Sequence, residues 1–285
     1  MSSSNAAREF KKNILGWNLQ LGFSHLTTSN LRVLARARPK SIVVVGIGGS
    51  GLAGDILSSV RREIGLRIPL FIWKDYGTPG EETAGLLRPL YVFVSFSGNT
   101  EETLSGLEGF ARAGKIRENV AVVTTGGKMK SLAERLRLPC VEFPAGSLTP
   151  RQATGSMFYG IVTALRAAGL GLRVPVFPRI RSARGEHPAK ALARQLKKRL
   201  LLFYTDESYR PVGAIWKIKC NETAKTLAFA NVVPEMNHNE LVGFETLRVP
   251  ASAIFFEDPG TYPRTKKDFE SQRNFSPPEA YACIP

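Results

Sequence analysis

A buried strand that runs directly into a glycine-rich turn is the feature that most constrains how this chain can fold. Residues 41–45 read SIVVV, a β-branched run of the kind that is buried on both faces of a parallel sheet. The run continues into GIGGSG at 46–51 and then into a helix with apolar periodicity. Further expected strands alternate with helices along the chain, at 68–73, 91–96, 120–123 and 140–143. This rhythm predicts an α/β fold with a parallel sheet and helices on both of its faces.

The alternation of strands and helices returns after an interruption, so two domains are expected. Residues 173–190 are rich in Pro, Arg and Gly, the composition of a linker. An N-terminal domain at 1–172 precedes this linker, and a smaller C-terminal domain at 191–269 follows it. The remaining expected elements are a helical lead-in at 5–38, helices at 150–168, 188–202 and 212–226, and strands at 200–205 and 253–256.

The last residues of the chain, 270–285, show neither helical nor strand periodicity. Only 29 residues follow Phe256, where the last expected strand ends. That stretch is too short to complete a sheet like the first one. We therefore expect the second domain to be incomplete at its C-terminus, with an aberrant tail at 270–285.

Basic residues exceed acidic ones by a wide margin. The 285 residues include 39 Lys and Arg against 24 Asp and Glu, a formal net charge of +15. Between Arg179 and Lys225 there are 12 basic and 4 acidic residues, a net charge of +8. Such an excess could serve nucleic acid, an anionic lipid surface or phosphorylated small molecules. The basic helix at 188–202 has a leucine stripe and no interleaved aromatic residues, so we interpret it as a solvated face and expect no nucleic-acid partner.

Membrane and metal-binding proteins are also disfavoured. The sequence has no run of about 18 apolar residues. Its first residues, MSSSNAAREFKKN, contain no apolar segment of a secretory signal. The three cysteines, Cys140, Cys220 and Cys283, form neither a CxxC pair nor a cluster with histidine. We therefore expect no membrane partner, no metal, no disulfide framework and a reducing, cytoplasmic location.

Two turns rich in glycine and hydroxyl groups carry the chemistry. The first, at 46–51, matches GxGxxG, and Asp75 lies 24 residues past Gly51, where a dinucleotide fold has its ribose-binding acid. Backbone amides at a helix N-terminus favour an anion, so a phosphate is expected there. The second turn, SFSGNT at 95–100, follows a strand and precedes a helix. Its three hydroxyls could surround a phosphate, whereas helix capping accounts for only one of them.

The two turns together resemble a known superfamily. GIGGSG and SFSGNTEET, about fifty residues apart and followed by TTGG, closely resemble the sugar isomerase (SIS) fold, and within it the bifunctional phosphoglucose/phosphomannose isomerases. PRQATG at 150–155, NETAK at 221–225 and PEMNHNELVGFE at 234–245 agree with the same family. The resemblance spans residues from about Ile42 to Asp258. It implies two SIS-type domains, each a flavodoxin-like parallel sheet flanked by helices. It also implies interconversion of glucose, mannose and fructose 6-phosphates without metal or other cofactor.

The resemblance also implies roles for individual residues. Arg151 of the PR motif contacts the substrate and stabilises the enediolate. Glu222 of the NExAK motif is the catalytic base, and His238 of the PExxHN motif opens the sugar ring. In the family this histidine reaches the site from the partner subunit, so a homodimer is implied. The remaining implied contacts to the sugar phosphate are Gly49, Ser50, Ser95, Ser97 and Thr100.

Aldose–ketose isomerisation accounts for these residue types. One carboxylate removes a proton from one carbon and returns it to the next. A guanidinium stabilises the negative charge of the enediolate, and histidine titrates near neutral pH, as ring opening requires. The residues alone leave other interpretations open: Glu222 could be a surface residue of a salt-bridged helix, and His238 an ordinary loop residue. His25 and His187 have no motif around them and are expected to be structural.

Two other functions stay open. One is a non-catalytic SIS protein that binds a sugar phosphate and regulates a partner. The other, from GIGGSG and Asp75, is an NAD-dependent dehydrogenase. The family has a further catalytic lysine near its C-terminus, whereas the last lysines here, Lys266 and Lys267, precede the tail. We therefore expect a truncation or frameshift after about Phe269, with sugar-phosphate binding retained and turnover impaired.

Overall fold

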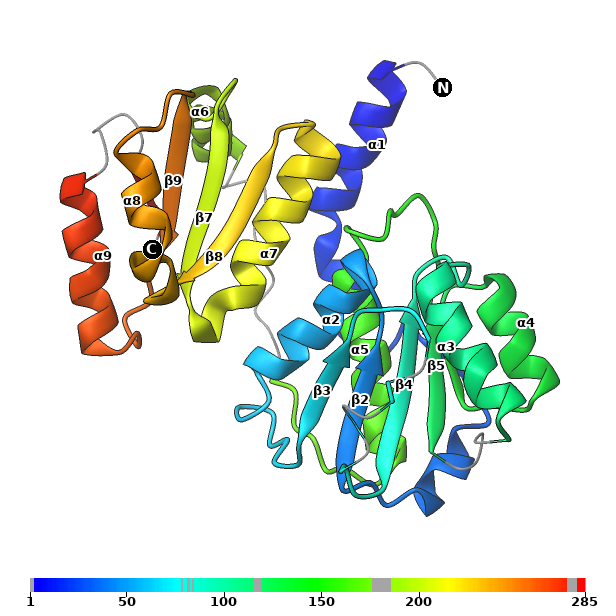
Figure 1. Ribbon diagram of the computed structural model, residues 1–285. Coiled ribbons are helices and arrows are strands. Elements are labelled where there is room, and N and C mark those ends of the chain that lie inside the picture. Colours follow the sequence, from blue (N-terminus) through cyan, green and yellow to red (C-terminus); the bar gives the residue numbers. More distant parts are fainter. Residues whose placement is uncertain are drawn as a thin grey trace. The chain divides into compact units, whose positions relative to one another are not determined.

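The computed structural model describes residues 3–77, 79–80, 83, 85–114, 119–175, 186–275 and 281–284 (Figure 1). The chain divides into two compact units, Met1–Ser182 and Ala183–Pro285. This division falls inside the segment for which the sequence predicts a linker, 173–190. Because residues 176–185 of that segment lie outside the described residues, the limits of the linker stay a prediction.

The sheet of the first unit has the strand order β1-β6-β5-β4-β2-β3. Strand β1 is antiparallel to β6 at one edge, and the other neighbours are parallel. Numbered from β2, the five parallel strands have the order 2-1-3-4-5, which is the flavodoxin-like order. The fold predicted from the sequence is confirmed in this respect. The strands are β1 (Thr27–Ser29), β2 (Ser41–Val45), β3 (Leu70–Trp73), β4 (Pro89–Ser95), β5 (Val120–Thr124) and β6 (Cys140–Glu142).

Helices cover both faces of this sheet because successive strand residues point to opposite sides. Val44 belongs to the core that packs on α2 and α5, whereas Val43 and Val45 belong to the core that packs on α3 and α4. All five residues of β2 are buried, as the β-branched run predicts. The helices are α2 (Gly48–Ser59), α3 (Glu101–Arg112), α4 (Gly127–Arg135) and α5 (Thr154–Ala167).

The second unit has a smaller parallel sheet, with the order β10-β9-β7-β8 among its described strands. Numbered from β7, this is the order 2-1-3-4, the beginning of the flavodoxin-like pattern. One side of the sheet is packed by Tyr204, Phe255 and Phe269, and the other by Phe203, Ile254 and Trp216. The elements are α6 (Glu186–Gln195), β7 (Leu200–Asp206), α7 (Arg210–Lys219), β8 (Ala228–Val233), α8 (Glu240–Phe244), β9 (Ala251–Phe256), α9 (Pro263–Phe275) and β10 (Tyr281–Ile284).

The structure corrects several element assignments. The expected helical lead-in at 5–38 contains α1 (Ser3–Leu15) but also β1, whose three exposed residues have no apolar pattern to detect. The helix expected at 188–202 ends at Gln195, because Leu200 already belongs to β7. Strand β8 and helix α4 were not predicted. The tail at 270–285, expected to lack regular structure, holds the end of α9 and strand β10, which pairs with β9.

Two further observations concern the described part of the chain. None of its helices combines the length and apolar composition that crossing a bilayer requires. Nor do His, Cys, Asp and Glu side chains gather there in a group of three or more that could hold a metal ion.

Candidate functional site

The two turns identified in the sequence meet at the carboxyl ends of the strands of the first sheet. GIGGSG follows β2 and SFSGNT begins at the end of β4, and these strands are neighbours with parallel register. Their following helices, α2 and α3, pack on opposite faces of the sheet. The carboxyl ends of β2 and β4 therefore form the topological switch point, where open α/β sheets bind their ligands.

Hydroxyl groups at this switch point accept hydrogen bonds from the backbone. The N–H of Phe96 donates to Ser50 Oγ at 3.1 Å, which ties the second turn to the first. Within the second turn, the N–H of Gly98 donates to Ser95 Oγ at 3.1 Å and that of Asn99 to Ser97 Oγ at 3.2 Å. Each serine thus fills an acceptor position with a backbone donor and keeps its own O–H proton for another partner.

The burial of these hydroxyls differs. Ser95 and Ser50 are buried, whereas Ser97 is exposed. Ser95 Oγ lies 2.8 Å from Thr100 Oγ1, so one proton of this pair is used between them. Thr100 stands directly before the first residue of α3, which starts with two glutamates. The cluster therefore offers hydroxyl donors beside the N-termini of two helices, an environment that favours an anion.

A third loop fixes the second turn in place. After β5, Thr125 Oγ1 donates to the carbonyl of Phe96 at 2.7 Å, and the N–H of Met129 donates to the carbonyl of Gly98 at 2.9 Å. Gly98 has φ +66°, and a Cβ on it would lie only 1.8 Å from the carbonyl oxygen of Gly126. Only glycine fits this backbone. The TTGG segment belonged to the predicted pattern, but its holding role follows from these contacts.

The PR motif lies at the same carboxyl end of the sheet. A Cβ on Gly49 would lie 2.9 Å from the carbonyl carbon of Pro150 and 3.1 Å from the Arg151 nitrogen, so the two segments are in close contact. The half-buried Arg151 has its guanidinium carbon 6.0 Å from the centre of the Phe10 ring. The structure therefore brings Gly49, Ser50, Ser95, Ser97, Thr100 and Arg151 together at one end of the first sheet.

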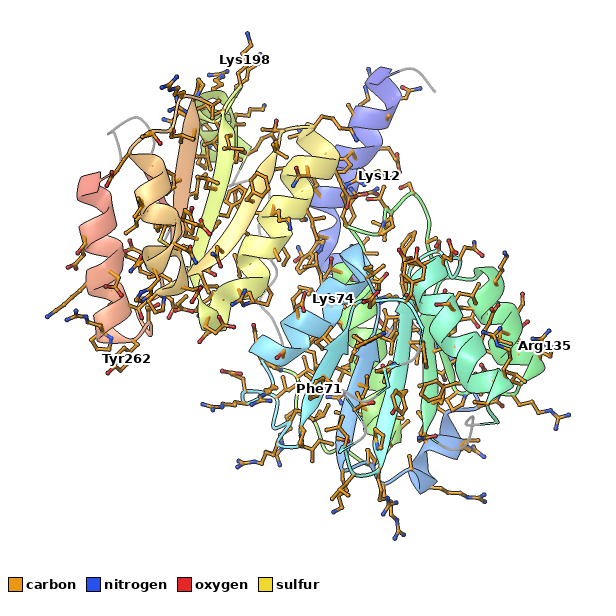
Figure 2. All side chains as sticks on the ribbon, in the orientation of Figure 1. Lys12, Phe71, Lys74, Arg135, Lys198 and Tyr262 are labelled. Atoms are coloured by element: carbon orange, nitrogen blue, oxygen red, sulfur yellow. The ribbon has the colours of Figure 1, made fainter. Side chains whose placement is uncertain are left out.

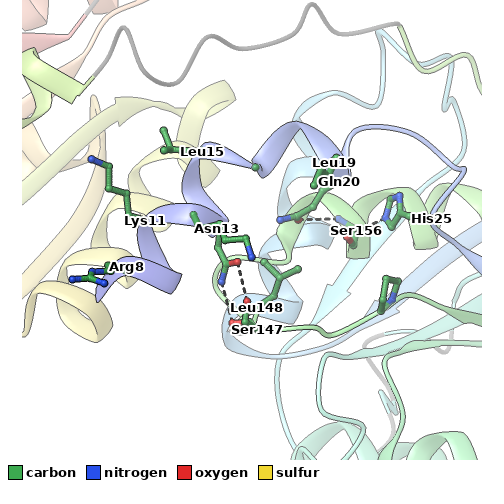
Figure 3. A pocket seen from close by; sticks show the side chains of 13 residues that line it. Arg8, Lys11, Asn13, Leu15, Leu19, Gln20, His25, Ser147, Leu148 and Ser156 are labelled. Carbon is green, nitrogen blue, oxygen red and sulfur yellow. Dashed lines mark hydrogen bonds between the residues drawn. The ribbon is translucent and has the colours of Figure 1, made fainter. Parts of the chain in front are cut away.

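Glutamines that the sequence did not suggest hold the Arg151 turn. Gln20 Nε2 donates to the carbonyl of Gln152 at 2.8 Å, and Thr149 donates through its N–H and its hydroxyl to Gln152 Oε1. Gln20 also lines a pocket of about 750 Å³ within the first unit (Figure 3). There His25 Nε2 lies 3.0 Å from Ser156 Oγ, and burial lowers the pKa of His25. Such single polar contacts leave no pattern in a sequence.

A lysine also lies beside the first turn without being predicted. Lys74, labelled in Figure 2, follows β3, and its Cε would be 3.2 Å from a Cβ on Gly51. Its Nζ lies 2.5 Å from Asp55 Oδ2, so the charge is balanced by a carboxylate of α2. The neighbouring Asp75 is exposed and accepts a hydrogen bond from the Tyr76 N–H at 2.7 Å.

Glu222 and His238 belong to the second unit and lie at opposite ends of β8. Glu222 is in a π-helical turn, Cys220–Ala224, and its neighbour Asn221 exchanges two hydrogen bonds with Ala228, the first residue of β8. His238 ends a 3₁₀ turn, Glu235–His238, that follows the last residue of the strand. A strand of six residues is about 20 Å long. Strand β8, labelled in Figure 1, therefore separates the segments that carry these two exposed residues within one copy of the unit.

Comparisons with known sequences identify related proteins. Residues 185–276 match the family described as the bacterial phospho-glucose isomerase C-terminal SIS domain. The bifunctional phosphoglucose/phosphomannose isomerase of Caldicellulosiruptor bescii is 31% identical over 222 residues, 72% of this chain and 62% of that protein. The protein of the same name from Thermoplasma acidophilum is 31% identical over 212 residues, 70% of this chain and 61% of that one. The D-glucosamine-6-phosphate 4-epimerase of Sulfolobus acidocaldarius is 30% identical over 206 residues, 71% and 63% of the two chains.

The chain thus spans less than two thirds of the length of these relatives. Solved structures extend the likeness of the fold to nearly the whole chain. A hypothetical protein of Thermus thermophilus matches with a TM-score of 0.68 and 18% identity, over 98% of this chain and 81% of that one. The C-terminal domain of glucosamine-fructose-6-phosphate aminotransferase from Francisella tularensis matches with a TM-score of 0.64 and 14% identity, over 98% of this chain and 82% of that one. From its motifs, its sheet order and these relatives, this chain is similar to the bifunctional phosphoglucose/phosphomannose isomerases, and its residues 185–276 match the C-terminal SIS domain of bacterial phospho-glucose isomerase.

Proposed function

We propose that this chain interconverts glucose 6-phosphate and mannose 6-phosphate with fructose 6-phosphate, by proton transfer through an enediolate and without metal or other cofactor. The observation that carries the proposal is the hydroxyl cluster at the switch point. Ser50, Ser95 and Ser97 each accept from a backbone N–H. The O–H protons of Ser50 and Ser97, and the one proton that the Ser95–Thr100 pair does not use internally, can therefore donate to a phosphate. The names of the relatives supply the class of substrate.

The phosphate is held by hydroxyls and helix ends in this proposal. Helices α2 and α3, each 12 residues long, begin at the two turns and direct backbone N–H groups and the positive ends of their dipoles to the anion. Lys74, paired with Asp55, adds no unbalanced charge at this place. Ser50, Ser95, Ser97, Thr100 and the backbone of Gly49 would be the contacts.

The proton transfer is assigned to Arg151, Glu222 and His238. Arg151, whose backbone touches Gly49, stabilises the negative charge that develops on the enediolate. Glu222 moves the proton between C1 and C2, and His238 assists ring opening. Glu222 and His238 of one chain lie at opposite ends of β8, which supports the proposal that His238 is supplied by the partner of a homodimer. We further propose that this enzyme works in the cytoplasm.

A coupled assay with fructose 6-phosphate tests this proposal. Glucose 6-phosphate and mannose 6-phosphate are measured separately, and both are expected to form. The same preparation is offered glucosamine 6-phosphate, because one relative with 30% identity is named as an epimerase of that sugar. Formation of neither hexose 6-phosphate at substrate concentrations that saturate binding would refute the isomerase assignment.

Variants separate the base from the binding site. Glu222→Gln keeps the size of the side chain and removes its basicity, so isomerisation should be lost while fructose 6-phosphate still binds. Thermal stabilisation by fructose 6-phosphate, with NAD as the comparison ligand, measures binding independently of turnover. Stabilisation by NAD alone would favour a dehydrogenase, and binding without turnover in the unaltered chain would favour a regulatory SIS protein.

A further inference from the structure

A carboxylate close to His238 joins three elements of the second unit. Glu240, the first residue of α8, accepts a hydrogen bond from Tyr204 Oη at 2.7 Å through Oε2. Its other oxygen accepts from Asn231 Nδ2 at 2.5 Å. Tyr204 lies on β7 and Asn231 on β8, and the two residues are register partners in the sheet. Both oxygens of the Glu240 carboxylate are thereby held by the sheet.

The donors of this network are themselves fixed. Tyr204 is 1% exposed and stacks on Phe255 with ring centres 5.1 Å apart. Burial, followed by the hydrogen bond to Glu240, raises the pKa of Tyr204, so the phenol keeps its proton and donates it. The orientation of Asn231 is set as well, because its Oδ1 accepts from the N–H of Val232 at 2.9 Å. Glu240 therefore has a defined position relative to the sheet.

The segment that carries His238 lies between two such fixed points. Met236, fully buried in the same core as Tyr204, anchors it on one side, and Glu240 anchors it on the other. Asn239 Nδ2 also donates to Glu235 Oε1 at 3.2 Å. His238 itself is exposed. An exposed side chain on a segment fixed at both ends can be presented to a substrate with little freedom of movement.

We propose that Glu240 is a positioning residue, which acts through the Tyr204–Glu240–Asn231 network to hold His238 where ring opening needs it. The inference rests on the proposed function for the role of His238. It adds a residue to which neither phosphate binding nor proton transfer is assigned. Because a misplacement of about 1 Å can reduce a catalytic rate about a hundredfold, loss of the network should lower kcat by roughly ten- to a hundredfold.

A series of variants distinguishes positioning from folding and from direct catalysis. Glu240→Ala removes both hydrogen bonds, Tyr204→Phe removes one, and Glu240→Gln keeps the shape with one acceptor and one donor. We expect kcat to fall most in Glu240→Ala and least in Glu240→Gln, with KM nearly unchanged. Glu245→Ala is the matched control, because it removes an exposed carboxylate directly after the same helix. Equal losses in Glu240→Gln and Glu240→Ala would overturn the proposal, since the charge itself would then be required.

A double-mutant cycle with His238→Ala shows whether Glu240 acts through the histidine. In the His238→Ala background, Glu240→Ala should cause no further loss of kcat. A second full loss there would mean that Glu240 acts independently of His238 and would refute the inference.

Amide hydrogen exchange tests the same inference without any turnover. The N–H groups of Asn237 and Asn239 donate to the carbonyls of Pro234 and Met236 within the segment. Both amides should exchange faster in Glu240→Ala and recover in Glu240→Gln, while those of β7 stay protected. Unchanged exchange at these amides, or equally accelerated exchange in β7, would refute positioning. If the unaltered chain shows no isomerase activity, the proposed function fails but this measurement still decides whether Glu240 holds the segment.

Discussion

Ser50→Ala is the change that most sharply tests how the phosphate cluster is built. Ser50 Oγ accepts from the buried N–H of Phe96 at 3.1 Å, and the proposed function uses its O–H toward phosphate. Removing the hydroxyl leaves that N–H without its acceptor, which should lower the free energy of unfolding by about 1–3 kcal/mol. It also removes one hydrogen bond to a charged group, worth about 1.5–3 kcal/mol, which corresponds to a roughly 10- to 150-fold weaker affinity for fructose 6-phosphate.

Ser97→Ala separates these two effects. Ser97 is exposed, and its oxygen accepts from the N–H of Asn99, so its removal should change the free energy of unfolding by no more than about 0.5 kcal/mol. Its affinity loss should still be comparable to that of Ser50→Ala. Thr163→Ala serves as the control, because the Thr163 hydroxyl donates to the carbonyl of Tyr159 in its own helix and should not affect affinity.

The measurements are urea unfolding for stability and isothermal titration calorimetry with fructose 6-phosphate for affinity. If Ser50→Ala lowers stability while binding stays intact, Ser50 is only an acceptor for the backbone. If both serine variants bind as tightly as the unaltered chain, the phosphate does not occupy the cluster and the reasoning fails.

Other predictions concern glycine, cysteine and histidine. In Gly98→Ala the added methyl group also collides with the Gly126 carbonyl, so the free energy of unfolding in urea should fall by more than the roughly 1–2 kcal/mol that a left-handed backbone costs. Gly146 has φ +50° and no atom close to the position of a Cβ, so Gly146→Ala should lower the free energy of unfolding only by that backbone cost. Burial raises the pKa of Cys140 to about 12, so mass spectrometry after iodoacetamide treatment at pH 8 should find it unmodified until urea unfolds the chain. The lowered pKa of His25 means that the unfolded chain binds its proton more readily, so stability should be full above pH about 6.5 and fall as pH drops. His25→Gln should flatten that dependence of the urea midpoint between pH 8 and 5, and an unaltered slope would contradict the assignment.

Strands buried on both faces could be predicted from their residues alone. The run at 41–45 coincides with β2 because a parallel strand between two helical layers is buried on both faces, and four of its five residues are apolar. Strand β8 was not predicted because Asn231 interrupts its apolar residues. The hydrogen bond from Asn231 to Glu240, which the sequence does not reveal, accounts for the amide side chain at this position. The regular structure near the C-terminus was not predicted, because α9 is mostly polar and packs on the core through the buried Phe269.

The candidate site was predictable as a set of residues but not as an arrangement. Hydroxyls at a helix start indicate an anion, and the resemblance supplied the remaining residues. The contacts that arrange the site join segments that are distant in the sequence. Ser50 accepts a hydrogen bond from the Phe96 N–H, and the Gly126 carbonyl lies against Gly98. The domain limits and the roles of the site residues stay predictions.

The separation of Glu222 and His238 along β8 has a consequence for mixtures of chains. If each site of a homodimer takes its base from one chain and its histidine from the other, then Glu222→Gln and His238→Ala chains are both inactive alone. When equal amounts of the two variants are mixed, random pairing makes about half of the dimers mixed. Each mixed dimer has one intact site and one site in which both residues are changed. About a quarter of the activity of the unaltered protein should therefore return. Dilution should abolish this recovered activity at the concentration where the dimers come apart.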